Sequence, residues 1–244
     1  MKSEALVAIA SPLAAEVGPA FYFDGATVAR GAELGLDVFQ FYALGRGGVL
    51  GNVETPVIVS AFGYFNAATV DQLWNTARAI VEPRVAARAF MECGHEFGRT
   101  HFGDVANLKE YCAAAETVTA AVHPAGLALF AGLAGEPLPT DLPARAMHLA
   151  ALLREFRGSA HLVAIVANEI EPKVAHYIRR PEMMGVFGYS PEEVPAVTDA
   201  ERTRLVQADA MTDRLVAGPY GVLNDEQADA LVAGLQAMKA ALAS

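Results

Sequence analysis

Five ionisable side chains crowd into one short stretch of this sequence: His148, Arg154, Glu155, Arg157 and His161. His148 and Glu155 are seven residues apart, so an α-helix places both on one face. His161 is expected in the first turn of the next helix, where the helix dipole disfavours the imidazolium form and keeps the ring neutral. A neutral imidazole can act as a general base, with Glu155 to orient it. His161, His148 and Glu155 are therefore candidate catalytic residues.

The arginines of the same stretch allow two further interpretations. Arg154 and Arg157, beside a carboxylate and a helix N-terminus, would suit the binding of an anionic ligand. Alternatively, Glu155 pairs with an arginine and fixes the junction between two helices, so that the whole block is structural. The residue types alone leave both interpretations open.

Aromatic side chains gather in the first quarter of the chain. Nine of the twenty Phe, Tyr and Trp residues lie between residues 21 and 65, namely Phe21, Tyr22, Phe23, Phe39, Phe41, Tyr42, Phe62, Tyr64 and Phe65. Neighbours such as Phe21 and Tyr22 cannot all face one core, and the tyrosine hydroxyls need partners. The cluster is either ordinary core or the wall of a ligand pocket, and in the second case Tyr42 and Tyr64 are candidate binding residues.

A glycine-rich segment, residues 45–52, could bring backbone N–H groups close to an anion. It lacks the Lys-Ser/Thr ending of a P-loop, and no strand precedes it as a dinucleotide-binding turn requires. We interpret it as the end of a helix followed by a tight connection. Arg46 is the one residue in it that we expect to bind a ligand.

Other combinations of reactive side chains match no known kind of site. Cys93, His95, Glu96, His101 and Asp104 lie close together in sequence, but their spacing fits no zinc pattern, so we predict no metal. The motifs of serine hydrolases and zinc proteases are absent. The sequence identifies no cofactor.

The elements that would position these residues are helices. Capping residues and glycine breaks in the stretch 141–180 predict helices over 141–157, 160–169 and 172–180, with Gly158 ending the first. Two helices joined by a short turn have the order of a helix-turn-helix unit. The stretch therefore raises the question of whether it reads DNA or forms a polar site on a helical scaffold.

Strand signals are nearly absent from the whole chain, so we predict an all-α fold, a multi-helix bundle of two packed halves. A break near Gly135 separates an N-terminal half, residues 1–135, from a C-terminal half, residues 140–244. The first carries the aromatic cluster and a helix expected over 25–44. The second contains a degenerate helix-turn-helix or winged-helix-like unit, with at most a two-stranded wing near 182–197.

Composition limits the partners and the location. A net charge of −10 opposes binding to DNA, which is a polyanion. Two cysteines make no disulfide framework, which indicates a reducing cytoplasm, and no apolar run is long enough to span a membrane. Hydrophobic residues make up 53% of the chain, which predicts an apolar cavity or a homodimer interface. The amphipathic helices expected over 198–217 and 224–243 are candidates for that interface.

The block 154–161, Arg-Glu-Phe-Arg-Gly-Ser-Ala-His, resembles the Leu-Arg-Glu-His-Arg-Gly-Asp-Gly-His block of an uncharacterised actinobacterial helix-turn-helix family of about this length. That family is related to winged-helix, MarR-like regulators. Shorter matches cover most of the chain; they are Gly45-Arg46, Leu50-Gly51, Thr55-Pro56-Val57, His148, and Asp213-Arg214-Leu215 with Pro219 and Tyr220, the last in place of Trp. The resemblance implies a helix-turn-helix scaffold and a DNA-binding function. The chain departs from the family where residues 188–193 run almost directly into the helix from Thr198, which shortens the wing.

Two functions of different classes follow from these observations. The first is a small-molecule-binding protein or an enzyme acting on an anionic or aromatic metabolite, in which arginines hold the anion and His161 or His148 is the base. The second is a ligand-responsive DNA-binding regulator of the MarR-like type. In that case Lys173, His176 and Arg180, which share roughly one face of a helix, would contact DNA. The acidic net charge favours the first.

Overall fold

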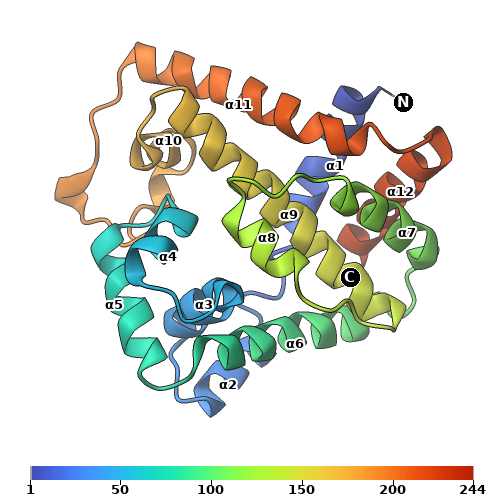
Figure 1. Ribbon diagram of the computed structural model, residues 1–244, viewed down its shortest axis with the longest axis horizontal. Helices are drawn as coiled ribbons and strands as arrows, with labels where there is room; N and C mark the ends of the chain where they lie inside the picture. The colour runs from blue at the N-terminus through green and yellow to red at the C-terminus, as the bar shows by residue number, and fades with distance from the viewer. Residues whose placement is uncertain (1, 244) are drawn as a thin grey trace.

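The computed structural model describes residues 2–243, and within that range it holds twelve α-helices, three short 3-10 helices and no strand (Figure 1). The all-α prediction is therefore confirmed. In chain order the helices are α1 Ser3–Val17, α2 Gly25–Glu33, α3 Val38–Gly47, α4 Thr55–Phe62, α5 Ala67–Arg78, α6 Pro83–Phe102, α7 Leu108–Ala120, α8 Ala128–Ala134, α9 Leu142–Ala167, α10 Pro172–Arg179, α11 Asp199–Tyr220 and α12 Asp225–Ala241. None of these helices is both long enough and apolar enough to cross a bilayer.

The long helix α9 runs through the middle of the molecule, between α11 on one side and α6 on the other (Figure 1). Its first turn is capped as the sequence predicts, because the side chain of Asp141 accepts a hydrogen bond from the backbone N–H of Ala144. Buried residues occur on all its faces, since helices surround it. The candidate residues His148 to His161 therefore project from a single rigid element.

The prediction that Gly158 ends a helix is wrong, because α9 continues unbroken from Leu142 to Ala167. A glycine inside a helix costs only about 1 kcal/mol relative to alanine, which the burial of flanking core residues outweighs. An ideal Cβ at Gly158 would meet no atom within 4 Å. The glycine therefore leaves open space beside the helix instead of ending it.

Replacing Gly158 by alanine is expected to raise the free energy of unfolding by about 0.5–1 kcal/mol. Alanine has the better helix propensity, and its methyl group enters open space. Urea denaturation followed by circular dichroism would measure the change. A loss of stability would mean that Gly158 is required for the backbone path of α9.

The two halves of the chain share one hydrophobic core. Helix α1 packs against α9, α11 and α12, while α7 packs against α9 and α12. The larger of two clusters of buried apolar side chains runs from Leu6 to Met238, and it takes in residues of both halves. Residues 1–135 and 140–244 are therefore interleaved, and the terminal helices bury one face inside the molecule.

The helix predicted over 25–44 is two helices, α2 and α3. The chain turns at Gly35, whose φ of +79° favours glycine, and Asp37 then caps α3 in a capping box with Gln40. Near its other end α3 lies very close to α6: an ideal Cβ at Gly45 would be 2.6 Å from the Cβ of Phe90. The glycine-rich segment thus allows close helix packing, which fixes the position of Arg46.

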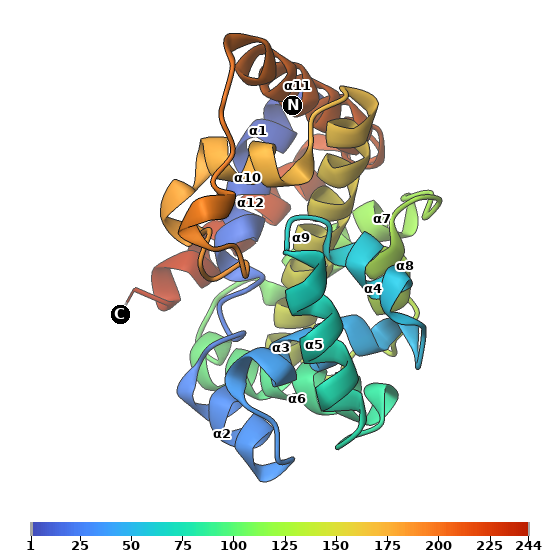
Figure 2. The same cartoon turned by 90° about the vertical axis from the view of Figure 1, so that its left-hand side faces the viewer.

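The segment between α10 and α11 contains no strand, so the two-stranded wing that the sequence allowed near 182–197 is absent from it. Pro181, Pro191 and Pro195 lack the N–H group that a strand ladder needs, and the chain forms 3-10 turns at Pro181–Met183 and Pro191–Glu193. Figure 2 shows α10 and this segment on one side of the molecule, below α11 and above α2 and α3. The backbone N–H of Asn66 donates to the carbonyl of Phe187 at 2.9 Å, which ties the segment to the start of α5.

Candidate ligand-binding site

The buried carboxylate of Glu155 on α9 accepts hydrogen bonds from three side chains. Arg46 of α3 donates from Nε at 2.7 Å and from Nη2 at 2.9 Å. Arg154 donates at 2.6 Å, and the hydroxyl of Tyr22 donates at 3.1 Å. Burial would raise the pKa of Glu155, but Arg154 and Arg46 outweigh burial and hold the pKa at about 2. The carboxylate is therefore ionised at neutral pH, which suits an orienting role and not that of a base.

This cluster leaves an excess of positive charge, because two arginines share one carboxylate. Arg46 also donates to the hydroxyl of Tyr42 at 2.9 Å, and its guanidinium lies 4.8 Å from the ring centroid of Phe62. The guanidinium of Arg154 lies 5.5 Å from the ring centroid of Tyr22. Aromatic faces attract cations, so the rings help to hold both arginines in place.

A cavity of about 430 Å³ lies beside this cluster, between α3, α4, α9, α10 and the segment after α10. Part of its wall is aromatic: Phe65 stacks on Phe187 with ring centroids 4.1 Å apart, and Phe23 stacks on Tyr42 at 5.3 Å. Phe23 is 52% exposed, which places it at a rim in contact with solvent. The volume is within the range of small-molecule sites.

The polar part of the cavity is lined by His161, Tyr64, His176, Arg157 and Arg179, and it meets the aromatic walls where the ring of His176 lies 3.9 Å from that of Phe187. The ring centroid of Tyr64 lies 6.3 Å from that of His161 and 6.0 Å from that of His176. Among residues 2–243, no side chain or backbone group forms a hydrogen bond with the buried Tyr64 hydroxyl or with Nε2 of His176. Such unsatisfied buried groups are costly, so this part is suited to a polar ligand.

The tautomer of His161 follows from its neighbours. The hydroxyl of Thr212 donates to the carbonyl of Ala208 at 2.7 Å, so it can only accept from Nδ1 of His161, 2.8 Å away. The imidazole therefore carries its proton on Nδ1 and has a free lone pair on Nε2. Burial, Arg179 and Arg157 lower the pKa of His161 to about 4. His161 is thus a neutral hydrogen-bond acceptor and a weak base at pH 7.

The charge of the cavity is opposite to that of the chain. Five arginines line the cavity together with two carboxylates, those of Glu155 and Asp209, whereas the whole chain has a net charge of −10. The arginines are Arg46, Arg154, Arg157, Arg179 and Arg180. An anion that enters from solvent would therefore find the cavity locally favourable.

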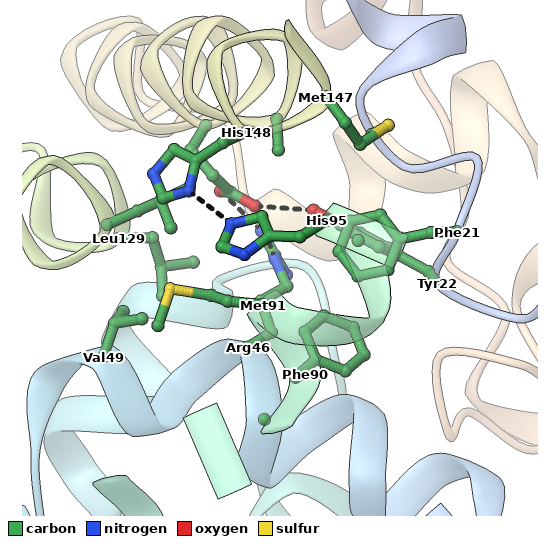
Figure 3. Close-up of a pocket in the computed structure, with 15 residues that line it drawn as sticks. Phe21, Tyr22, Arg46, Val49, Phe90, Met91, His95, Leu129, Met147 and His148 are labelled. Atoms are coloured by element: carbon green, nitrogen blue, oxygen red, sulfur yellow. Dashed lines mark hydrogen bonds and ion pairs between the residues drawn. The ribbon is translucent and has the colours of Figure 1, made fainter. Parts of the chain in front are cut away.

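His148 lies apart from this cavity, in a smaller one of about 40 Å³ that adjoins it at Tyr22, Arg46 and Glu155 (Figure 3). Nδ1 of His148 is 3.0 Å from Nε2 of His95, and the two rings point toward each other (Figure 3). Burial and the neighbouring His95 lower the pKa of His148 to about 4. Of the candidate catalytic residues, His161 and Glu155 therefore share the large cavity, while His148 does not line it.

The residues predicted to contact DNA do not form one solvent-exposed face. His176 is buried, and its ring lies 3.9 Å from that of Phe187. Lys173 lies against the ring of Tyr189, with Nζ 5.5 Å from the centroid. Arg180 is exposed and lines the rim of the large cavity together with His176.

The structure brings the candidate binding residues together around the large cavity: Arg46, Arg154, Arg157, Tyr42 and Tyr64 all line it. Sequence reasoning missed Arg179 and Asp209, which also line it, and did not single out Tyr22 from the aromatic cluster as a binding residue; His95, considered only as a metal ligand, lines the small one. Arg179 and Asp209 form an ion pair between α10 and α11. The amphipathic pattern of α10 could have indicated that one of its faces is turned inward.

We expect nuclear magnetic resonance titration of the histidine rings to give pKa values of about 4 for both His148 and His161. An unfolded histidine titrates near 6.5, so between about pH 6.5 and 4 the unfolded chain binds more protons than the folded one. The stability that the two neutral rings contribute is therefore lost as the pH falls through that window. A pKa at or above 6.5 for His161 would contradict the arrangement described.

A family model described as a helix-turn-helix family matches residues 8–244 of the chain. Comparisons with curated proteins and with solved structures gave no match.

Proposed function

Because the chain belongs to a helix-turn-helix family, we propose that it uses this scaffold to bind a small anionic molecule with an aromatic or apolar part. The observation that carries the proposal is the large cavity, which combines aromatic walls with five arginines inside an acidic protein. The unsatisfied Tyr64 hydroxyl and Nε2 of His176 in its polar part support it. An occupant would complete both hydrogen-bonding groups.

Each group in the cavity has a role in this proposal. The rings of Tyr42, Phe65 and Phe187 contact the aromatic part of the ligand, while Arg154 and Arg157 bind its charged group. Nε2 of His161 accepts a hydrogen bond from a hydroxyl or N–H group of the ligand. Glu155 binds no ligand, because it holds Arg46 and Arg154 in place.

Replacing His161 by alanine is expected to weaken the binding of 6-hydroxy-2-naphthoate, a flat aromatic anion whose hydroxyl can donate to Nε2, about tenfold, and to leave the binding of 2-naphthoate, which has no donor, nearly unchanged. The melting temperature should change by less than about 4 °C, because Thr212 keeps its hydrogen bond to the carbonyl of Ala208. Isothermal titration calorimetry and a thermal melt measure the two effects. His101→Ala is the matched control, since His101 is exposed and lines neither cavity. If 2-naphthoate does not bind the wild-type protein, the proposal fails; if His161→Ala unfolds it, His161 is structural.

A ligand-responsive DNA-binding regulator of the winged-helix, MarR-like type is the second candidate. Its support is the family, together with the order of α9, a turn at residues 168–171 and α10. Helix α10 would then be both the second helix of that unit and a wall of the cavity, which would couple the ligand to DNA. A tight, sequence-specific complex with the gene's own upstream DNA, abolished by a Lys173/Arg180 double alanine variant, would establish this function.

A further inference from the structure

Two positive charges at the large cavity have no carboxylate of their own. Arg46 and Arg154 share the single carboxylate of Glu155, which leaves one charge in excess. Arg180 also lines the cavity, and in the described part of the chain no Asp or Glu oxygen forms an ion pair with it. Arg180 is therefore the second of the two positive charges that have no carboxylate partner.

The remaining two arginines of the cavity are balanced. Arg157 donates to Asp213 at 2.8 Å, and Arg179 pairs with Asp209. The pairs are partly exposed, so each arginine keeps N–H groups free for a ligand while its charge is neutralised. The positive charge of the cavity that no carboxylate balances is therefore close to two.

Several hydrogen-bond donors line the same cavity. Arg154, Arg157 and Arg179 line it together with Tyr64 and His161, whose ring centroids are 6.3 Å apart. The hydroxyl of Tyr64, which has no partner among residues 2–243, is a further donor.

We propose that the charged group of the ligand is a dianion of the phosphomonoester type; this rests on the proposed function and specifies its ligand. Because both uncompensated positive charges belong to one cavity, a single group that carries two negative charges matches them. A phosphomonoester carries between −1.5 and −2 charges at neutral pH and three acceptor oxygens, which suits several N–H and O–H donors at once. A carboxylate or a phosphodiester carries a single negative charge and would leave one of the two uncompensated positive charges without a counter-charge.

The experiment compares two ligands of nearly the same shape, 2-naphthyl phosphate and 2-naphthyl sulfate, by calorimetry at pH 8. The phosphate ester carries two charges and the sulfate ester one. Binding of the phosphate is expected to be about tenfold tighter or more, from an additional charge-assisted interaction. Arg180→Gln should reduce this ratio, whereas Arg30→Gln, which removes a surface charge paired with Glu33, should leave it unchanged.

The pH dependence gives an independent readout. The pKa of His161 is about 4 and that of Glu155 is about 2, so neither group changes its charge between pH 8 and about 6, and burial lowers the pKa of His176 as well. The second pKa of a phosphomonoester is about 6. Binding of 2-naphthyl phosphate should therefore weaken as the pH falls from 8 to 6, while binding of 2-naphthyl sulfate stays constant.

The possible results distinguish a ligand that is not a dianion from a protein that does not bind aromatic anions at all. Equal affinity for the two esters, or a preference that Arg180→Gln does not change, would overturn the dianion and leave the binding of aromatic anions intact. If neither ester nor 2-naphthoate binds, the proposed function itself fails. Tighter, pH-dependent binding of the phosphate that is reduced in Arg180→Gln is the expected result.

Discussion

Glu155→Gln is expected to lower the free energy of unfolding by about 3–5 kcal/mol, because it leaves the mostly buried Arg46 and the partly exposed Arg154 without a counter-charge. The folded-state pKa of about 2 lies below the ordinary value of 4.5, so the ionised carboxylate stabilises the protein above about pH 4.5. That contribution is lost as the pH falls toward 2. Urea denaturation at pH 7 and at pH 3 should show a smaller difference between variant and wild type at the lower pH.

A surface ion pair supplies the control for this prediction. Arg30 and Glu33 form an exposed pair on α2, so Glu33→Gln should cost less than about 1 kcal/mol. In a Glu155→Ala variant, added formate or acetate should restore part of the lost stability, because it can enter between the two arginines. A Glu155→Gln protein as stable as wild type would show that the cluster is not buried as described.

Gly158→Leu is expected to abolish binding of 2-naphthoate, with a loss of about a hundredfold or more, since the leucine side chain would fill the space that the glycine leaves beside α9. The fold should persist, because no atom lies within 4 Å of an ideal Cβ there. Isothermal titration calorimetry measures the affinity, and circular dichroism checks the fold.

The matched control is Ala167→Leu, which adds the same side chain at an exposed position of the same helix. It should bind 2-naphthoate like the wild type, and Gly158→Ala should fall between the two. Undiminished binding by a folded Gly158→Leu protein would place the ligand somewhere other than the large cavity.

The helical nature of the chain was predictable because it depends on local periodicity and capping. Asp141 caps α9 as its sequence context suggests. Whether a glycine ends a helix depends instead on what surrounds it. Gly158 lies within a helix that is packed on several sides, and that environment was not visible in the sequence.

The aromatic cluster between residues 21 and 65 contains both core residues and residues that line the large cavity. Phe41 is buried in the core, whereas Phe39 and Phe65 line the large cavity. The sequence suggested that neighbouring aromatics face different ways. It did not specify which of them face the cavity, because that depends on the rotation of α3 and α4 about their axes.

Most features of the site that the sequence did not predict depend on contacts between residues far apart in the chain. Tyr22 bonds to Glu155 across 133 residues, and Arg179 of α10 pairs with Asp209 of α11. The spacing of Lys173, His176 and Arg180 predicted that His176 lies on a DNA-contacting face. Its ring is buried instead, because the segment after α10 folds back and places Phe187 against it.

A crystal structure of the protein with 2-naphthyl phosphate would test the central claim most directly. The naphthyl ring is predicted between the aromatic walls formed by Tyr42, Phe65 and Phe187, with the phosphate oxygens within hydrogen-bond distance of Arg154 and of the Tyr64 hydroxyl. A ligand bound outside this cavity, or an empty cavity at a concentration that saturates binding in solution, would contradict the account.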